Sequence, residues 1–212
     1  MHVLRRIVLS LTVDYFFAPQ SPWAYLGHAR FQGIAREAGA QIRVMPIDLG
    51  GRVFPVSGGL PLAKRAPQRQ AYRLLELERF ARWLGLPLHL HPRFFPVQGD
   101  DAARLIIAVD QLDGAEPAMA LAGAVLSACW AEELNIADEA TLAGLLARCG
   151  LPASRIEDGH SQAAQVRYEA DTLRAVEAGV FGAPSYMVDG ELFWGQDRLD
   201  FLERRLSAGT QR

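Results

Sequence analysis

The stretch IVLSLTVDYFFAPQSPWAYLGHARFQGIAREAGAQIRVMPIDL, residues 7–49, decides the fold of this chain. Its first part, Ile7–Phe17, is rich in β-branched and aromatic residues and predicts a buried strand. Apolar residues then recur at helical spacing from Trp23 until Gly39, which ends the predicted helix. A second apolar run, Gln41–Leu49, predicts a parallel strand, because a strand, a helix and a strand in succession form a right-handed βαβ unit.

Strand signals are absent from the hundred or so residues that follow a glycine- and proline-containing loop at Gly50–Pro61. Five helices are predicted there, over residues 68–85, 100–112, 116–134, 138–149 and 161–178. The end of the chain predicts two strands, Pro184–Val188 and Glu191–Trp194, joined by Asp189-Gly190, a pair typical of type I′ hairpin turns. A last helix follows, with Asp197 predicted as its N-cap.

The order of these elements indicates the fold class. Without the helical block, the chain has the order βαβαββα, which is that of a thioredoxin-like fold. We therefore predict an α/β protein with a thioredoxin-like fold and a large all-helical insertion. The predicted thioredoxin-like domain is discontinuous and consists of residues 1–61 and 179–212, whereas residues 62–178 form the insertion, whose last helix packs back on the sheet.

Composition excludes several classes of partner. Of the 212 residues, 50% are hydrophobic and 22% are charged, and the formal net charge is −2. The arginines are scattered among acids, which argues against nucleic acid, and no stretch approaches the roughly 20 apolar residues that cross a bilayer. The apolar run Ile7–Val13 is short and rich in β-branched residues, so it predicts a strand and not a secretory signal. We expect a cytoplasmic protein without nucleic-acid or membrane partners.

A serine and a proline mark the start of the first helix. Ser21 is a good N-cap, and Pro22 fits the first helical position, because an N–H at that position has no hydrogen-bond partner within the helix. In thioredoxin-like redox proteins a Cys-x-x-Cys motif occupies this position, where orphan amides and the macrodipole stabilise a thiolate. Here the four residues are Ser21-Pro22-Trp23-Ala24, so disulfide exchange at this site is excluded.

The hydroxyl of Ser21 could instead donate a hydrogen bond to an anion that comes from outside. Glutathione supplies a thiol with an unperturbed pKa near ~8.5, by analogy with cysteine. A charge-assisted hydrogen bond contributes roughly 1.5 to 3 kcal/mol, which lowers that pKa by about one to two units. The alternative is that Ser21 is only a helix cap.

A second signal precedes the third strand. Val180-Phe181-Gly182-Ala183-Pro184 ends in a proline at the position where this fold places a cis-proline. The residue before that proline offers its backbone to a cysteine-containing ligand, like an added β-strand. The sequence therefore predicts a ligand-binding backbone at Ala183.

Together these motifs carry a family resemblance, over the segments 14–17, 21–26, 179–184 and 192–199 (DYFF, SPWAYL, GVFGAP and LFWGQDRL). The chain resembles the 2-hydroxychromene-2-carboxylate isomerases and the kappa-class glutathione transferases, which belong to the DsbA-like thioredoxin superfamily. The resemblance spans essentially the entire chain, including Gly59-Leu60-Pro61 and APQRQAY at residues 66–72. It implies a glutathione-dependent isomerase of aromatic catabolism. It also implies a homodimer and a substrate that is a small aromatic carboxylate or another electrophile.

The resemblance also implies roles for individual residues. Ser21, as the catalytic residue, would hydrogen-bond the glutathione sulfur, with Pro22 and Trp23 on either side of it. Ala183 would pair its backbone with the cysteine of glutathione. The family commonly has a second small hydroxyl where Ala24 stands, so a supporting donor is missing there.

The other end of glutathione would lie on the turn after the last strand. By the resemblance, Gln196 and Asp197 would hold the γ-glutamyl group, with Arg198 beside them. The amide of Gln196 suits the carboxylate of the γ-glutamyl group, and the carboxylate of Asp197 suits its ammonium. Asp197 can serve as helix cap and ligand at once. Gly59 would contact glutathione where relatives often have an asparagine.

Two other functions stay open. A kappa-like glutathione transferase or peroxidase would consume glutathione, whereas the isomerase would return it unchanged. A noncatalytic thioredoxin-like protein would bind a protein or peptide in the same groove and would not need glutathione.

The remaining reactive side chains are predicted to be structural. His89 and His91 have no matching acid or cysteine cluster, so no metal site is predicted. His28 lies two turns beyond Ser21, too far to act as its base. Core positions are predicted for Cys129 and Cys149, and core or pocket-wall positions for Trp83, Trp130 and Trp194.

Overall fold

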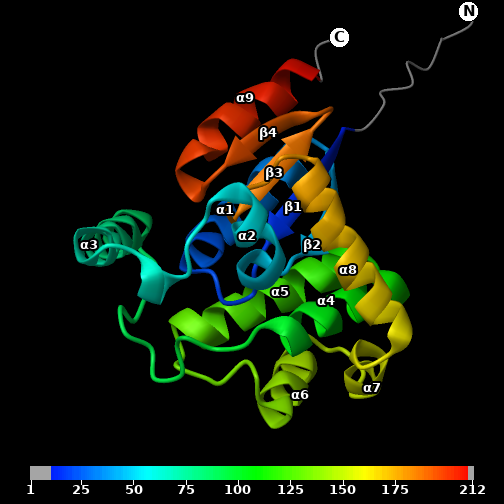
Figure 1. The fold of residues 1–212 in the computed structure, drawn as a ribbon. Helices are drawn as coiled ribbons and strands as arrows, with labels where there is room; N and C mark the ends of the chain where they lie inside the picture. Colours follow the sequence, from blue (N-terminus) through cyan, green and yellow to red (C-terminus); the bar gives the residue numbers. More distant parts are fainter. Residues whose placement is uncertain (1–10, 210–212) are drawn as a thin grey trace, which may run out of the picture.

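A mixed four-stranded sheet lies at the centre of the computed structural model, which describes residues 11–209 (Figure 1). The strands are β1 (Thr12–Phe17), β2 (Gln41–Pro46), β3 (Ser185–Val188) and β4 (Glu191–Trp194), in the order β2-β1-β3-β4. Strand β1 is parallel to β2 and antiparallel to β3, and β3 is antiparallel to β4. This is thioredoxin-like topology, so the predicted fold class is confirmed.

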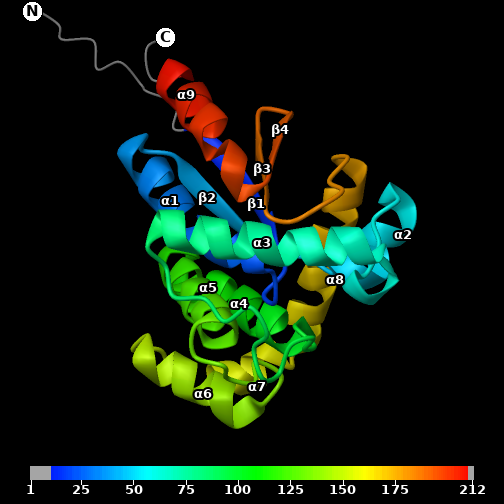
Figure 2. The ribbon, with the colours of Figure 1, turned by 90° about the vertical axis from the view of Figure 1, so that its left-hand side faces the viewer.

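Helices surround the sheet and fill the chain between β2 and β3 (Figure 2). They are α1 (Pro22–Glu37), α2 (Phe54–Ser57), α3 (Pro67–Leu84), α4 (Asp100–Asp113), α5 (Ala115–Trp130), α6 (Glu139–Arg148), α7 (Arg155–Gly159), α8 (Gln162–Glu177) and α9 (Leu199–Gly209). Shorter turns are the π-helical η1 (Leu49–Val53) and the 3₁₀ turns η2 (Leu62–Lys64) and η3 (Gln196–Arg198). None of the helices within residues 11–209 has both the length and the apolar character that crossing a bilayer requires. The predicted domain boundaries stay a prediction.

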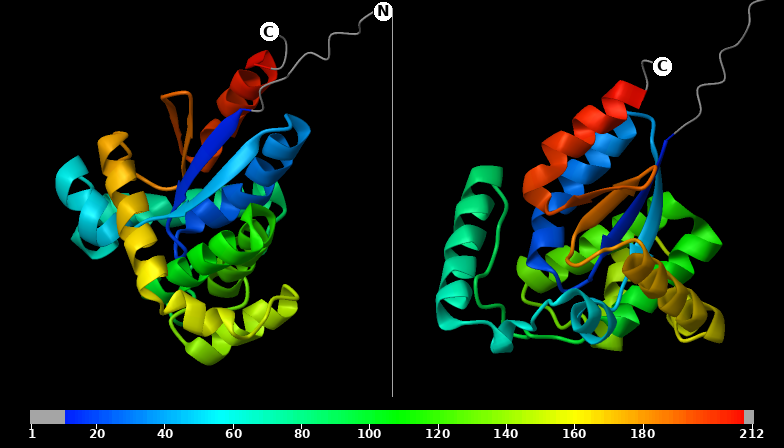
Figure 3. Two further views of the ribbon diagram at one scale, coloured as in Figure 1. Left: turned by 90° about the vertical axis from the view of Figure 1, so that its right-hand side faces the viewer. Right: turned by 45° about the horizontal axis from the view of Figure 1, so that its top comes forward.

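The two faces of the sheet bury different sets of residues, because successive side chains of a strand point to opposite sides. Tyr15 and Phe17 of β1 share a core with Phe31 of α1 and with residues of α4, α5 and α9. Phe16 belongs to a second core, which includes Ala175 of α8. The sheet therefore lies between α1 and α9 on one side and α8 on the other (Figure 3).

Helix α8 is tied to the sheet by a buried carboxylate. Asp14 of β1 is 6% exposed and accepts hydrogen bonds from Arg43 of β2 at 2.7 Å and from Arg174 of α8 at 2.6 Å. Next to it, Thr172 of α8 accepts a hydrogen bond from the backbone of Asp48 at 3.0 Å. These contacts join two strands and a helix that are far apart in the chain.

Several predicted element boundaries were wrong. The second strand ends at Pro46, three residues early, because the Asp48 side chain accepts a hydrogen bond from the Gly51 amide and starts the turn η1. The predicted loop at residues 50–61 holds most of η1 and all of α2, helix α5 stops at Trp130, and α7 was not predicted. Residues 7–10 of the predicted first strand lie outside the described residues.

Of the three tryptophans expected in the core or in a pocket wall, Trp130 lies in the core and Trp83 does not. Trp130 is 0% exposed, but Trp83 is 70% exposed and Trp194 is 40% exposed. Helix α3 buries only the stripe that contains Leu77 and Ala81, and Trp83 lies off that stripe. The right-hand view of Figure 3 shows α3 beside the body of the protein. Arg30 of α1 lies over the Trp83 ring, 5.9 Å from its centre, and most of the ring stays exposed.

Candidate functional site

Ser21 begins helix α1, directly after the short loop that follows β1. Its amide donates to the carbonyl of Ala18 at 2.9 Å, which turns the chain from strand to helix. Its hydroxyl accepts a hydrogen bond from the amide of Ala24 at 3.2 Å, and the side chain is 7% exposed. The predicted N-cap is confirmed, with Pro22 at the first helical position. The hydroxyl hydrogen has no acceptor among the described residues and can be donated to a ligand.

The loop before β3 lies beside the loop after β1. Phe16 pairs with Ser185 in an antiparallel register, so the residues that follow β1 and those that precede β3 meet at one end of the sheet. The Ala183–Pro184 peptide bond is cis. Within residues 11–209, no hydrogen bond outside the strands uses the backbone N–H or carbonyl of Ala183. That backbone is therefore free to pair with an extended ligand.

The turn after β4 reaches the same end of the sheet, because Trp194 pairs with Ser185. In this turn Gln196 is 1% exposed and packs against α1, where a Cβ on Gly27 would lie only 2.7 Å from the Cβ of Gln196. Both amide atoms of the Gln196 side chain are buried without a hydrogen-bond partner within the described residues. Such a group is costly unless it finds a partner, so a polar atom of a ligand or water is expected there.

Asp197 and Arg198 form an exposed ion pair at 2.8 Å. Asp197 lies inside the turn η3 and its carboxylate contacts Arg198, so the prediction that Asp197 caps α9 was wrong. The Arg198 guanidinium also lies 5.2 Å from the centre of the Trp194 ring, which packs against Phe181 at 4.9 Å. A ligand ammonium would have to share the Asp197 carboxylate with Arg198.

Trp23 packs against the helical insertion, whereas Gly59 packs against Phe54 of α2. Trp23 is partly buried and meets the edge of Phe80 of α3, with ring centres 6.1 Å apart. Gly59 follows α2, where a Cβ on it would overlap the ring of Phe54. An asparagine at this position would therefore have to displace Phe54.

Sequence reasoning missed the contacts that connect the insertion to Ser21. The indole N–H of Trp130, at the end of α5, donates to the carbonyl of Gln20 at 3.2 Å. The guanidinium of Arg73 of α3 lies over the same indole, 5.7 Å from the ring centre. The arginines of α3 have the spacing of a solvated helix face, so no sequence signal distinguished Arg73 from its neighbours.

His28 is held inside the protein, as predicted. Its ring nitrogens lie 3.2 Å from the Tyr15 hydroxyl and 2.9 Å from the Met119 carbonyl. Burial lowers the pKa of His28 to about 4, although the bond to Met119 opposes the shift. A neutral imidazole with both nitrogens engaged has a structural role.

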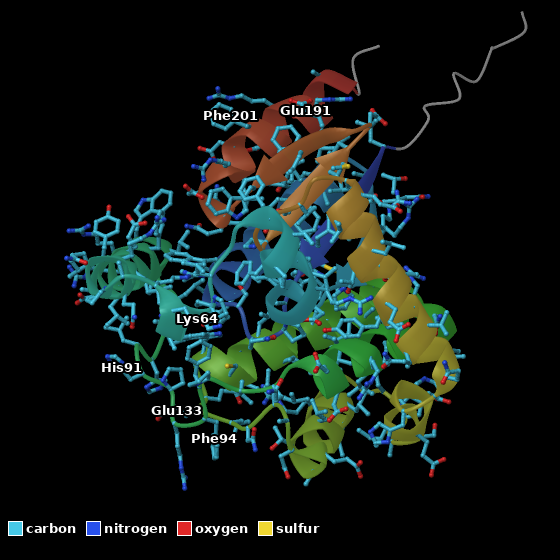
Figure 4. All side chains as sticks on the ribbon, in the orientation of Figure 1. Lys64, His91, Phe94, Glu133, Glu191 and Phe201 are labelled. Carbon is cyan, nitrogen blue, oxygen red and sulfur yellow. The ribbon has the colours of Figure 1, made fainter. Side chains whose placement is uncertain are left out.

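The remaining candidates are two cysteines and two histidines. Burial raises the pKa of the Cys129 thiol to about 12, and it also raises the pKa of Cys149, so neither thiol is activated. His89 and His91 are exposed on the loop between α3 and α4, where His91 is labelled in Figure 4. Within residues 11–209, no group of three His, Cys, Asp or Glu side chains is placed to hold a metal ion.

Comparisons with known proteins agree with this architecture. Residues 12–207 match the family model of the DsbA-like thioredoxin domain. A 2-hydroxychromene-2-carboxylate isomerase from Sphingobium xenophagum is 31% identical over 199 residues, which cover 93% of this chain and 99% of the relative. The chain therefore belongs to the DsbA-like thioredoxin family and, within it, to the family of the 2-hydroxychromene-2-carboxylate isomerases.

Solved structures lead to the same fold. The structure of a 2-hydroxychromene-2-carboxylate isomerase superposes with a TM-score of 0.77 at 29% identity, over 93% of this chain and 95% of the other. The cytosolic disulfide reductase DsbM from Pseudomonas aeruginosa, solved with glutathione, superposes with a TM-score of 0.66 at 20% identity, over 93% of this chain and all of the other. The second likeness concerns the fold alone.

Proposed function

We propose that this protein is a glutathione-dependent isomerase of the 2-hydroxychromene-2-carboxylate isomerase type, with Ser21 as its catalytic residue. The observation that carries the proposal is the Ser21 hydroxyl, which caps α1 beside the unpaired backbone of Ala183 and keeps its hydrogen for a ligand. The named activity of the relatives supports it. DsbM with glutathione supports the view that this fold accommodates the tripeptide.

The residues at this end of the sheet fit glutathione. The backbone of Ala183 would pair with the cysteinyl residue, and Pro22 and Trp23 would flank the sulfur. The orphaned amide of Gln196 and the carboxylate of Asp197, with Arg198, would hold the γ-glutamyl end. Gly59 would contribute only its backbone, because the Phe54 ring occupies the space of a side chain.

When bound, glutathione supplies a thiolate that can add reversibly to a conjugated carbon. Ser21 donates a hydrogen bond to that sulfur, and the N-terminus of α1 adds its positive dipole end. One such bond lowers the thiol pKa by about one to two units, because a charge-assisted hydrogen bond contributes roughly 1.5 to 3 kcal/mol. Ser21 cannot form a disulfide, and both cysteines have raised thiol pKa values. This chain is therefore not expected to exchange disulfides.

The site supports an isomerase of aromatic catabolism, because the rings of Trp23, Phe181 and Trp194 offer apolar surface to an aromatic carboxylate. We also propose a cytoplasmic location, where reduced glutathione is abundant, and a homodimer, from the family resemblance. Sedimentation of the purified protein measures the oligomeric state.

The test is to titrate the protein with glutathione by calorimetry and then to follow a 2-hydroxychromene-2-carboxylate by ultraviolet absorbance. The proposal expects saturable binding and a loss of substrate that leaves the amount of free thiol unchanged. Consumption of thiol would favour the kappa-like transferase or peroxidase. A protein that binds no glutathione would favour the noncatalytic binding protein.

A further inference from the structure

Arg73 lies on the inner face of α3, toward the first helix. Arg73, Leu77 and Phe80 are spaced four and three residues apart and so share one side of the helix. Leu77 packs with Leu26 of α1, and Phe80 meets the edge of Trp23 with ring centres 6.1 Å apart. The side of α3 that carries Arg73 therefore faces the segment that begins with Ser21.

The guanidinium of Arg73 is held between aromatic rings. It lies 5.5 Å from the centre of the Phe95 ring and 5.7 Å from the centre of the Trp130 ring. Trp130 in turn donates its indole hydrogen to the carbonyl of Gln20, the residue before Ser21, at 3.2 Å. One indole thus contacts both the cation and the loop that positions the proposed catalytic hydroxyl.

No acid neutralises this cation. Among residues 11–209, no carboxylate oxygen lies within 4.0 Å of Arg73. Three other partly buried arginines of the insertion differ, because Arg104, Arg155 and Arg167 each pair with an aspartate. A half-buried guanidinium presents five donors, and here none of them has a hydrogen-bond partner in the part of the chain that the structure describes.

The surroundings make the unpaired cation unfavourable. Burial lowers the pKa of Arg73 to about 10, and the positive charge of Arg65 adds to the effect. Burial and the charge of Arg69 lower the pKa of Arg65 as well. Around the start of α3, Arg65, Arg69 and Arg73 thus form a group of cations, none of which has a carboxylate within 4.0 Å among residues 11–209. An anion would stabilise such a group.

We propose that Arg73 is a specificity-determining residue that binds the carboxylate of the aromatic substrate. This assignment rests on the proposed function and extends it, because it names the residue that selects an acid. A planar guanidinium matches a carboxylate with two parallel hydrogen bonds, and the rings of Phe95 and Trp130 hold it in place. The carboxylate bound there would lie beside the Ser21 loop.

The test compares a nonreactive acid with its uncharged analogue. The probes are naphthalene-2-carboxylate and naphthalene-2-carboxamide, titrated calorimetrically into the native protein without glutathione. We expect the acid to bind about 10- to 100-fold more tightly than the amide, from one charge-assisted bidentate contact. Arg73→Met should abolish this preference and keep the affinity for the amide. Arg79→Met is the matched control and should keep the preference, because Arg79 lies on the outer face of α3 over Tyr72.

Several results would overturn the assignment. They are an Arg73→Met protein that still prefers the acid, a native protein without any preference, and an equal loss in both variants. A loss of affinity for glutathione in Arg73→Met, with the acid preference intact, would place the glycyl carboxylate of the tripeptide on Arg73 instead. If Arg73→Met does not fold, as judged by circular dichroism, Arg73→Lys must show a reduced preference for the acid over the amide. Lysine keeps the positive charge but lacks the planar pair of donors that binds a carboxylate with two hydrogen bonds. Because the titration contains no glutathione, its outcome is independent of whether the protein binds glutathione.

Discussion

Replacing Ser21 by alanine removes two functions of one hydroxyl, and they can be measured separately. The oxygen accepts the Ala24 amide at 3.2 Å, so its loss is expected to lower the free energy of unfolding by about 1 kcal/mol. For a chain of this size that corresponds to a fall in melting temperature of about 2 to 4 °C. The hydrogen is the part that the proposed function uses, because it has no acceptor within the described residues.

Ser161 provides a matched control at the start of α8. Its hydroxyl accepts the Ala164 amide at 3.2 Å, the same distance as at Ser21, but it donates its hydrogen to the Asp158 carbonyl at 2.6 Å. Ser161→Ala should therefore cost at least as much stability as Ser21→Ala. It should leave bound glutathione unaffected.

The assay is the ultraviolet absorbance of the thiolate of bound glutathione as the pH is raised. Ser21→Ala should raise the pKa of the bound thiol by about one to two units and keep most of the affinity for the tripeptide. Ser161→Ala and the native protein should titrate together. An unchanged thiol pKa in Ser21→Ala, or the same change in both variants, would refute the proposed role of Ser21.

Three further predictions concern the scaffold. The folded-state pKa of His28 is about 4, below its unfolded value of 6.5, so the stability that is fully present above pH 6.5 should fall by roughly 3 kcal/mol between pH 6.5 and pH 4. Denaturant unfolding across this pH range checks the fall, and His28→Gln should lack most of it. Gly27→Ala should lower the free energy of unfolding by about 1 to 3 kcal/mol, because the added Cβ clashes with Gln196. Gly33→Ala on the same helix is the control and should not lower it, because a Cβ there has no heavy atom within 4 Å. Thermal melts of both variants check this. Asp14→Asn should lower the free energy of unfolding by about 1 to 3 kcal/mol in denaturant titrations, because Arg43 and Arg174 lose their carboxylate partner. A change near zero would show that water hydrogen-bonds the exposed ends of those arginines instead.

The elements with local turn chemistry were predictable from the sequence. Asp189 and Gly190 have φ angles of 49° and 83°, both in the left-handed region that a type I′ turn requires, and β4 has the predicted bounds. Ser21 was equally readable as an N-cap, because the cap depends only on residues 21–24. In both places the short-range sequence determines the backbone.

Features that depend on distant segments were not predictable. The strand expected through Leu49 ends at Pro46, and α7 has only five residues, too few for a periodic pattern. The position of Arg73 depends on where the end of α5 and the loop before α4 lie in space, and helical spacing alone places it among solvated arginines. The unpaired amide of Gln196 likewise appears only when α1 packs on η3.

The candidate site exists because three strand ends coincide. The antiparallel pairing of β3 with both β1 and β4 brings residues 18–21, 183–184 and 195–198 to one end of the sheet. A cysteine at position 21 would itself carry the sulfur, whereas a serine can only polarise a sulfur that a ligand brings. The chemistry then depends on what else is bound beside that ligand, and this is decided by the helical insertion. Within the insertion, Trp130 donates a hydrogen bond to Gln20 of the Ser21 loop and also lies against Arg73. Selectivity for the substrate is therefore expected to change with Arg73 and Trp130, while activation of the thiol is expected to change with Ser21.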